Sequence, residues 1–272
     1  MSATGPGPWD IVDRLSAWAK ETPWCDWLEL GGSLARGGGD RYSDVDAALG
    51  VAGDVPLPVA CEAVLEAAGT FAPVADSLRQ NFGTDPAPAE HVIVQYADGR
   101  QLSLVVLAAA DRPGAPPGAR VLLDRSGRLA GTWLPRQLEA SSGERREWAF
   151  LSWVNLGDAV KHARRGTVWR AVHSLGLARD YAWKLYAASR GLEYPEFGPV
   201  TVETANVPPP PGIEDTHPRA IEPGSISSAA LSLAAVLGPL SEGLSVEGVR
   251  AVTERNLRSA GGDVTGSAPR RR

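Results

Sequence analysis

Two aspartates, two residues apart at the start of an apolar run, are the residues whose types and spacing best fit chemistry. Asp44 and Asp46 flank Val45 and are followed by Ala47-Ala48-Leu49. Alternate side chains of a strand point to opposite faces, so both carboxylates would project the same way while Val45 points into the core. Paired carboxylates repel each other unless a cation lies between them, and their hard oxygens suit Mg²⁺ shared with substrate phosphates. The spacing therefore predicts a metal site.

A glycine turn precedes the aspartates and follows a short apolar run. In Gly31-Gly32-Ser33 the glycines let the backbone approach a ligand closely, because they carry no Cβ. The Ser33 hydroxyl and nearby backbone N–H groups can donate to phosphate oxygens, and Arg36 adds a fixed positive charge. We expect Gly32, Ser33, Arg36 and Ser43 to contact a nucleotide. The alternative interpretation is a glycine-rich surface loop before an ordinary strand with an acidic edge.

The order Gly-Gly-Ser, short polar loop and Asp-x-Asp resembles the signature of the nucleotidyltransferase superfamily typified by DNA polymerase beta. The match of Gly-Gly-Ser-Leu-Ala-Arg-Gly with Ser-Asp-Val-Asp is closest to the aminoglycoside, lincosamide and minimal nucleotidyltransferases. The resemblance implies that Gly32 and Ser33 hold a triphosphate, and that Asp44 and Asp46 are catalytic and bind two Mg²⁺ ions. ATP or another NTP would be the co-substrate. No Gly-Lys-Ser/Thr follows the glycines and no Gly-x-Gly-x-x-Gly opens a helix here, which excludes those two phosphate-binding motifs at this turn.

A predicted hairpin departs from the family pattern. Residues 91–96 and 101–107 are β-rich runs joined by Ala97-Asp98-Gly99-Arg100, and Asp-Gly between two such runs favours a hairpin. The family normally places a third carboxylate on the second of these strands, where this sequence has Ser103. A serine supplies neither a charged metal ligand nor, without a partner, a general base at neutral pH.

Three explanations of Ser103 stay open. Glu90, Asp98 or Asp111 could reach the metals from a neighbouring position. A carboxylate from a second domain could take the proton of the acceptor, as small-molecule members of the family allow. Alternatively, the chain could bind nucleotide and metal without catalysing transfer.

The whole chain is typical of a globular protein, with 272 residues, 43% of them apolar and 22% charged. We expect an α/β (α+β) nucleotidyltransferase fold, a mixed sheet with flanking helices, in residues 1–130, followed by a helical bundle in residues 131–272. The domain boundary is expected within about 125–140, beyond a proline- and glycine-rich connection. A net charge of −5 argues against a duplex nucleic-acid surface, and two cysteines imply no disulfide framework. Neither a signal segment nor a membrane span is predicted, so we expect a cytoplasmic protein.

The second half contains long helical patterns over residues 144–165 and 167–190. Arg164-Arg165-Gly166-Thr167 separates them, which predicts an antiparallel helical hairpin. This hairpin resembles the C-terminal domain of antibiotic nucleotidyltransferases. Lys161, Arg165 and Trp169 are candidates for binding the second substrate, and Asp158 is a candidate base on the acceptor side. A solvated ion pair and a core tryptophan are the alternative interpretation.

The proline content of residues 191–224 predicts a long extended crossing segment between helices. Further helices are expected over 227–237 and from Ser245 onward. The predicted activity is transfer of a nucleoside monophosphate, AMP from ATP, to a hydroxyl of a small antibiotic-like molecule, with release of pyrophosphate and a cleft between the domains. This activity would fit antibiotic resistance, and a homodimer is compatible with it. The alternatives are a catalytically degenerate nucleotide-binding or regulatory protein and a protein-modifying minimal-type nucleotidyltransferase.

Overall fold

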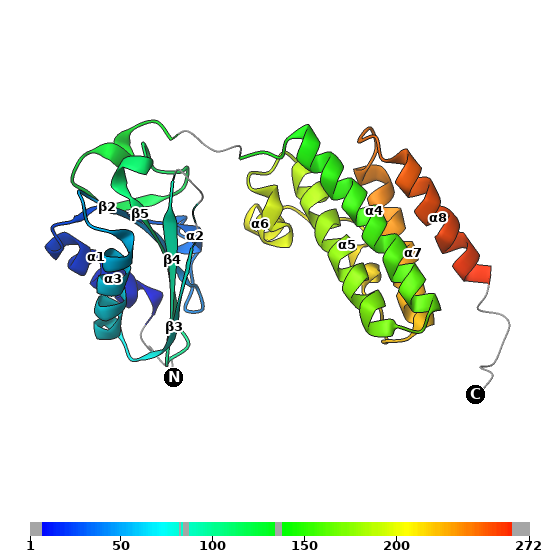
Figure 1. The fold of residues 1–272 in the computed structure, drawn as a ribbon, viewed down its shortest axis with the longest axis horizontal. Coiled ribbons are helices and arrows are strands. Elements are labelled where there is room, and N and C mark those ends of the chain that lie inside the picture. The colour runs from blue at the N-terminus through cyan, green and yellow to red at the C-terminus, as the bar shows by residue number, and fades with distance from the viewer. Residues whose placement is uncertain (1–6, 82, 84–86, 134–137, 263–272) are drawn as a thin grey trace. The chain divides into compact units, whose positions relative to one another are not determined.

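The chain folds into two compact units, residues 1–135 and 136–272 (Figure 1). The structure is a computed structural model that describes residues 7–81, 83, 87–133 and 138–262. The first unit is built on a six-stranded sheet and the second contains only helices, turns and loops among its described residues. The expected fold class, a mixed sheet with helices followed by a helical bundle, is confirmed.

The sheet of the first unit has the strand order β3-β4-β5-β2-β1-β6. Strands β2 and β5 are parallel, and the other neighbouring pairs are antiparallel. The strands are β1 (Cys25–Leu30), β2 (Val45–Val51), β3 (Val74–Asn81), β4 (Ala89–Tyr96), β5 (Gln101–Ala108) and β6 (Arg120–Asp124). Strands β4 and β5 form the predicted hairpin, in whose turn Gly99 has a φ of 92°. Strand β2, which carries the aspartate motif, therefore lies in the interior of the sheet.

Two helices, α1 (Pro8–Glu21) and α3 (Leu57–Phe71), cover one face of this sheet (Figure 1). The alternation of side chains sends one set of strand residues to this face, where they pack with both helices in a buried core. That set includes Leu28, Leu30, Val45, Ala47, Leu49, Val92, Leu102 and Leu104. Helix α3 continues beyond Gly69, the predicted stop, because Phe71 is buried in the same core and holds the last turn.

The other face of the sheet carries the polar side chains. By the same alternation and the observed strand register, residues of β1, β2, β4 and β5 share this face. We call it the second face, and it is defined by Trp27, Glu29, Asp46, Ala48, His91 and Ser103. A small cluster of Trp27, Ala48, Ala109 and Leu129 covers part of it. The catalytic candidates of the first unit thus lie opposite the helices, where a ligand can approach.

The second unit is a bundle in which α4 (Ser142–Arg164) and α5 (Val168–Ser189) form the predicted helical hairpin. Helix α4 begins with a capping box, in which Ser141 and Glu144 satisfy each other's backbone N–H groups. The core is built mainly from alanine and leucine side chains around Trp153, which is fully buried. The indole N–H of Trp153 donates to Ser241 Oγ at 3.1 Å. This bond links α4 to the C-terminal end of α7 (Pro223–Leu240), which Ser241 caps.

Two sequence expectations for the second unit are wrong in detail. The crossing over residues 191–224 is not simply extended, because it contains the short helix α6 (Pro199–Thr204) and two single turns of 3₁₀ helix. Helix α7 (Pro223–Leu240) begins earlier than predicted, with a proline in its first turn, and it runs through Pro239 instead of stopping at Gly238. The last helix is α8 (Glu247–Gly262).

Helix α7 has the length and mean hydropathy, 1.3, of a membrane span, the one such helix in the part of the chain that the structure describes. One third of that segment is buried inside the protein, and the helix packs on α4, α5 and α8. A core helix passes the same test of length and composition. The buried side chains Ile226, Leu233 and Leu237 show that α7 contributes to the bundle core.

We predict that Leu49→Ala lowers the free energy of unfolding by about 2–5 kcal/mol, because Leu49 is fully buried between the sheet and its helices. The matched control is Leu78→Ala on edge strand β3, where the side chain is 52% exposed and the expected change is within about 0.5 kcal/mol. Denaturant unfolding of the two variants and the wild type measures both values. Equal losses in the two variants would contradict the assigned core.

Candidate functional site

The glycine turn after β1 rests directly on Asp46. The N–H of Gly31 donates to the backbone carbonyl of Asp46 at 2.7 Å. Gly32 has a φ of 61°, and a Cβ at this position would lie 2.1 Å from Asp46 Oδ2. Both the left-handed backbone and the close approach require glycine here. The sequence motif Gly-Gly-Ser therefore brings the backbone of the turn, at the start of the short helix α2 (Gly32–Ala35), against a carboxylate.

The two aspartates lie at the start of β2 and differ in environment. Asp44 directly precedes the strand and is exposed, whereas Asp46 is half-buried on the second face. Burial raises the pKa of Asp46 above its usual value, and the negative charge of Asp44 raises it further. The charges of Arg36 and His91 and a hydrogen bond from Ser103 act in the opposite direction. The pair is thus a centre of negative charge that a cation would stabilise.

Ser103 lies beside Asp46, directly opposite it in the parallel β2–β5 pair. This register supports the sequence alignment in which a serine takes the place of the family's third carboxylate. His91 Nε2 lies 2.9 Å from Ser103 Oγ, and the Ser103 side chain acts to lower the pKa of the neighbouring Asp46 carboxyl group. Sequence analysis missed His91. The signal was available, since the Asp-Gly hairpin sets a register that brings His91 diagonally beside Ser103 on one face.

Glu90, Asp98 and Asp111 were the three acids that could have supplied the missing third carboxylate, and none of them lies with Asp44 and Asp46. Glu90 alternates to the face that the helices cover and bonds Arg79 at 3.1 Å. Asp98 lies in the hairpin turn and binds the guanidinium of Arg100 at 2.7 Å, which holds its pKa below the usual value. Asp111 lies exposed in a 3₁₀ turn after β5. In the described ranges there is no group of three or more His, Cys, Asp or Glu side chains placed to hold a metal ion.

The remaining nucleotide-binding candidates of the first unit surround the turn. Ser33 lies in the first turn of α2, and its carbonyl accepts the N–H of Gly38 at 3.1 Å. Arg36 is exposed at the end of α2, where its charge acts on Asp46. The Ser43 hydroxyl accepts the backbone N–H of Asp40 at 2.9 Å and so closes the loop that leads to Asp44. Ser43 thus has a structural role in shaping this loop.

A buried ion pair between Glu29 and Arg112, also missed from the sequence, lies on the same second face. Glu29 is opposite Ala48, one position along the face from Asp46, and its carboxyl group is almost completely buried. Burial raises the pKa of Glu29 to about 7, although Arg112 acts against this. The Arg112 guanidinium lies over the ring of Trp133, 4.6 Å from its centroid. These contacts tie the segment after β5 to the sheet beside the aspartate pair.

The structure brings three of the four substrate-binding candidates of the second unit together and leaves Trp169 apart from them. Asp158, Lys161 and Arg165 line a groove of about 440 Å³ between α4 and α8, where Asp158 and Lys161 form an ion pair. Trp169 does not line this groove and is 72% exposed on α5, so the interpretation of Trp169 as a core residue is wrong. The three groove residues remain candidates for substrate binding.

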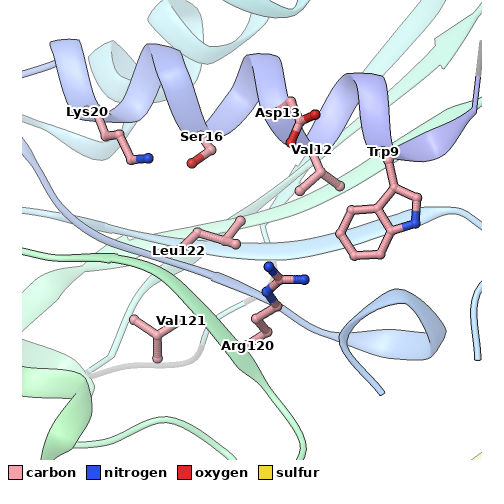
Figure 2. Close-up of a pocket in the computed structure, with 8 residues that line it drawn as sticks. All are labelled: Trp9, Val12, Asp13, Ser16, Lys20, Arg120, Val121 and Leu122. Atoms are coloured by element: carbon pink, nitrogen blue, oxygen red, sulfur yellow. The ribbon is translucent and has the colours of Figure 1, made fainter. Parts of the chain in front are cut away.

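Another cavity, of about 470 Å³, lies between α1 and edge strand β6 (Figure 2). Lys20, Asp13 and Arg120 supply its charged groups, and the Arg120 guanidinium lies over the ring of Trp9 at 5.5 Å from its centroid. No residue of the glycine turn or the aspartate pair lines it. This cavity is therefore separate from the candidate site.

We predict that Gly32→Ala disrupts the site more than Gly37→Ala does. Both positions have left-handed backbone, φ 61° and 76°, so each alanine costs about 1–2 kcal/mol of strain. Only the Cβ at position 32 meets a neighbour, the Asp46 carboxylate, whereas nothing lies within 4 Å of the Cβ at position 37. Magnesium-dependent nucleotide binding should be lost in Gly32→Ala and retained in Gly37→Ala. Loss in both variants would show that general strain, not the contact with Asp46, is responsible.

We also predict that Asp46→Asn stabilises the protein without ligand. Because the folded-state pKa of Asp46 is raised, its ionisation destabilises the folded state as pH increases from about 4 through that raised value. The gain in the free energy of unfolding should be absent at low pH and full at pH 8. Denaturant unfolding at both pH values measures it, with Asp54→Asn, an exposed position, as control. A loss of stability at pH 8 would contradict the described electrostatics.

Comparison with known proteins gives distant structural likenesses, among which are the following two. No protein-family model and no curated protein matches the sequence. An aminoglycoside 6-adenyltransferase from Bacillus subtilis is 14% identical with a TM-score of 0.38, over 92% of this chain and 97% of that one. The CD-NTase CdnG of Bradyrhizobium diazoefficiens, solved in complex with GTP, is 13% identical with a TM-score of 0.28, over 93% and 94% of the two chains. Both names denote nucleotidyltransferases.

Proposed function

We propose that this chain is a nucleotidyltransferase that transfers a nucleoside monophosphate from an NTP to a hydroxyl of a small molecule. The observation that carries the proposal is the contact between the Gly31-Gly32 turn and Asp46. This contact joins a backbone suited to phosphate oxygens and a carboxylate pair suited to a divalent cation. A plain surface loop before an acidic strand would not need such a close approach.

The aspartate pair fits Mg²⁺ by its chemistry. Asp44 and Asp46 supply hard carboxylate oxygens, and the charge of Asp44 raises the pKa of Asp46, so a cation between them would relieve a repulsion already present. When bound, the ion would neutralise charge on the phosphates during transfer. Gly32, Ser33 and Arg36 would hold the triphosphate around it. We infer ATP as the co-substrate from the motif's resemblance to the small-molecule branch.

In the proposed reaction, the acceptor hydroxyl oxygen forms a bond to the α-phosphorus of the NTP. The bond from that phosphorus to the oxygen bridging to the β-phosphate breaks, and pyrophosphate leaves. The proton of the hydroxyl passes to a base, for which Asp158 is the candidate, and its groove residues Lys161 and Arg165 would bind the acceptor. An antibiotic-like alcohol is the proposed acceptor class, again from the resemblance of the motif.

A catalytically quiet nucleotide-binding protein is the second candidate function, and Ser103 is the observation that favours it. The carboxylate expected at this position is absent, and none of the neighbouring acids within the described ranges replaces it. Binding of nucleotide would then serve regulation. Pyrophosphate release in the presence of candidate acceptors, such as aminoglycosides and lincosamides, separates transfer from binding alone.

We predict that the chain binds an NTP in a magnesium-dependent way and that Asp44→Asn/Asp46→Asn weakens this binding at least tenfold. Calorimetric titration of ATP, GTP, CTP and UTP, each with and without Mg²⁺, measures this. Asp54→Asn is the matched control, because it removes the same charge at the opposite end of β2. Binding that ignores Mg²⁺ or survives the double substitution would overturn the metal assignment. Binding of no nucleotide would overturn the proposed function.

A further inference from the structure

Three polar side chains on three neighbouring strands lie in a row across the second face. Ser103 on β5 is the central member, with Asp46 of β2 on one side and His91 of β4 on the other. Its hydroxyl lies 2.9 Å from His91 Nε2 and, because Ser103 is opposite Asp46 in the β2–β5 pair, is placed to donate to that carboxylate. The proposed function gives no role to His91.

The direction of these hydrogen bonds follows from the groups involved. An ionised carboxylate only accepts, and a serine hydroxyl has a single proton to donate. Ser103 therefore donates to Asp46 and accepts from the N–H at His91 Nε2. With its proton and one lone pair both engaged, the hydroxyl has a fixed orientation, which in turn fixes the rotamer of the carboxylate. His91 on β4 thus acts on Asp46 through Ser103, although β4 does not pair with β2 in the sheet.

The number of charged ligands limits the number of cations. The described residues contain no third acid, histidine or cysteine that joins Asp44 and Asp46 in a metal-binding group. A Mg²⁺ ion is commonly held by one or two carboxylates together with substrate phosphates. Asp44 and Asp46 are enough for one such ion, whereas Ser103, which stands where a third carboxylate was expected, adds no charged ligand for a second one.

We propose that His91 is a positioning residue, which fixes Asp46 through Ser103, and that the site binds one divalent cation per chain instead of two. The inference rests on the proposed function, because it takes Asp44 and Asp46 as metal ligands. It replaces the two ions expected from the sequence by one, and it gives the His91–Ser103 pair the task of orienting a ligand. Partners that orient metal ligands typically contribute 10–100-fold to metal affinity.

The test is a titration of the full chain with Mn²⁺, in which electron paramagnetic resonance measures the free ion. The wild type should bind one Mn²⁺ per chain at this site. His91→Ala and Ser103→Ala should each weaken this binding by roughly 10-fold or more. His91→Gln keeps an N–H donor near the place of Nε2, so it should retain an affinity within a few-fold of the wild type. This rescue would not follow from a merely structural role for the imidazole ring.

The matched control is His162→Ala in the helical unit. His162 contacts a hydroxyl in the same way, with Nδ1 3.1 Å from Thr167 Oγ1, but it lies on α4 and not on the sheet that carries the aspartates. Its loss should leave Mn²⁺ binding unchanged. Circular dichroism of each variant shows whether it is folded. If His91→Ala is unfolded, the Mn²⁺ affinities of Ser103→Ala and His91→Gln test the positioning role instead.

The outcomes separate this inference from the proposed function. Two Mn²⁺ ions per wild-type chain that both depend on Asp44 and Asp46 would overturn the single-ion proposal. An affinity that depends on the aspartates but is unchanged in Ser103→Ala and His91→Ala would overturn the positioning role alone. Absence of Mn²⁺ binding by the chain alone would overturn this inference only, because the proposed function allows the ion to enter with the phosphates. Mn²⁺ binding that is indifferent to Asp44→Asn/Asp46→Asn would overturn the proposed function and this inference together.

Discussion

The close contact between Gly32 and Asp46 is the constraint on which the candidate site depends. A left-handed glycine lets the turn after β1 lie against the carboxylate, and no side chain fits between them. The contact is possible because β1 and β2 are neighbouring antiparallel strands in the interior of the sheet. The sheet therefore determines how far the backbone proposed to bind phosphates lies from the carboxylates proposed to bind a metal ion.

The electrostatics of the second face show two solutions for a buried carboxylate. Glu29 is neutralised within the protein by Arg112, and this pair ties a loop to the sheet. Among the described residues no salt bridge joins Asp46 to a cation: the groups that act on it are the like charge of Asp44, the charges of Arg36 and His91, and the Ser103 hydroxyl. An unrelieved repulsion costs folding stability, and its persistence is expected where an external cation completes the site. This difference distinguishes a structural pair from a candidate functional one.

The sequence predicted the features that depend on local pattern. The glycine turn, the aspartates on one strand, the Asp-Gly hairpin and the α4–α5 hairpin all follow from spacing over a few residues, and the structure has these elements. His91 and the Glu29–Arg112 pair were missed, because their roles depend on strand register and on a distant loop. The sequence predicted that α7 stops at Gly238-Pro239, and this end is too early. Burial of side chains in the bundle core stabilises both ends of the helix despite the local helix-breaking residues.

The central claim is that a divalent cation and a nucleotide bind at the glycine turn and the aspartate pair. The most direct measurement is the broadening of backbone NMR signals by Mn²⁺ in the presence of a non-hydrolysable ATP analogue, using deuterated full-length protein. The account predicts that broadening is strongest at residues 31–36, 43–47 and 103, next to the proposed ion. Broadening centred on the groove between α4 and α8, or spread evenly over acidic surface residues, would contradict it.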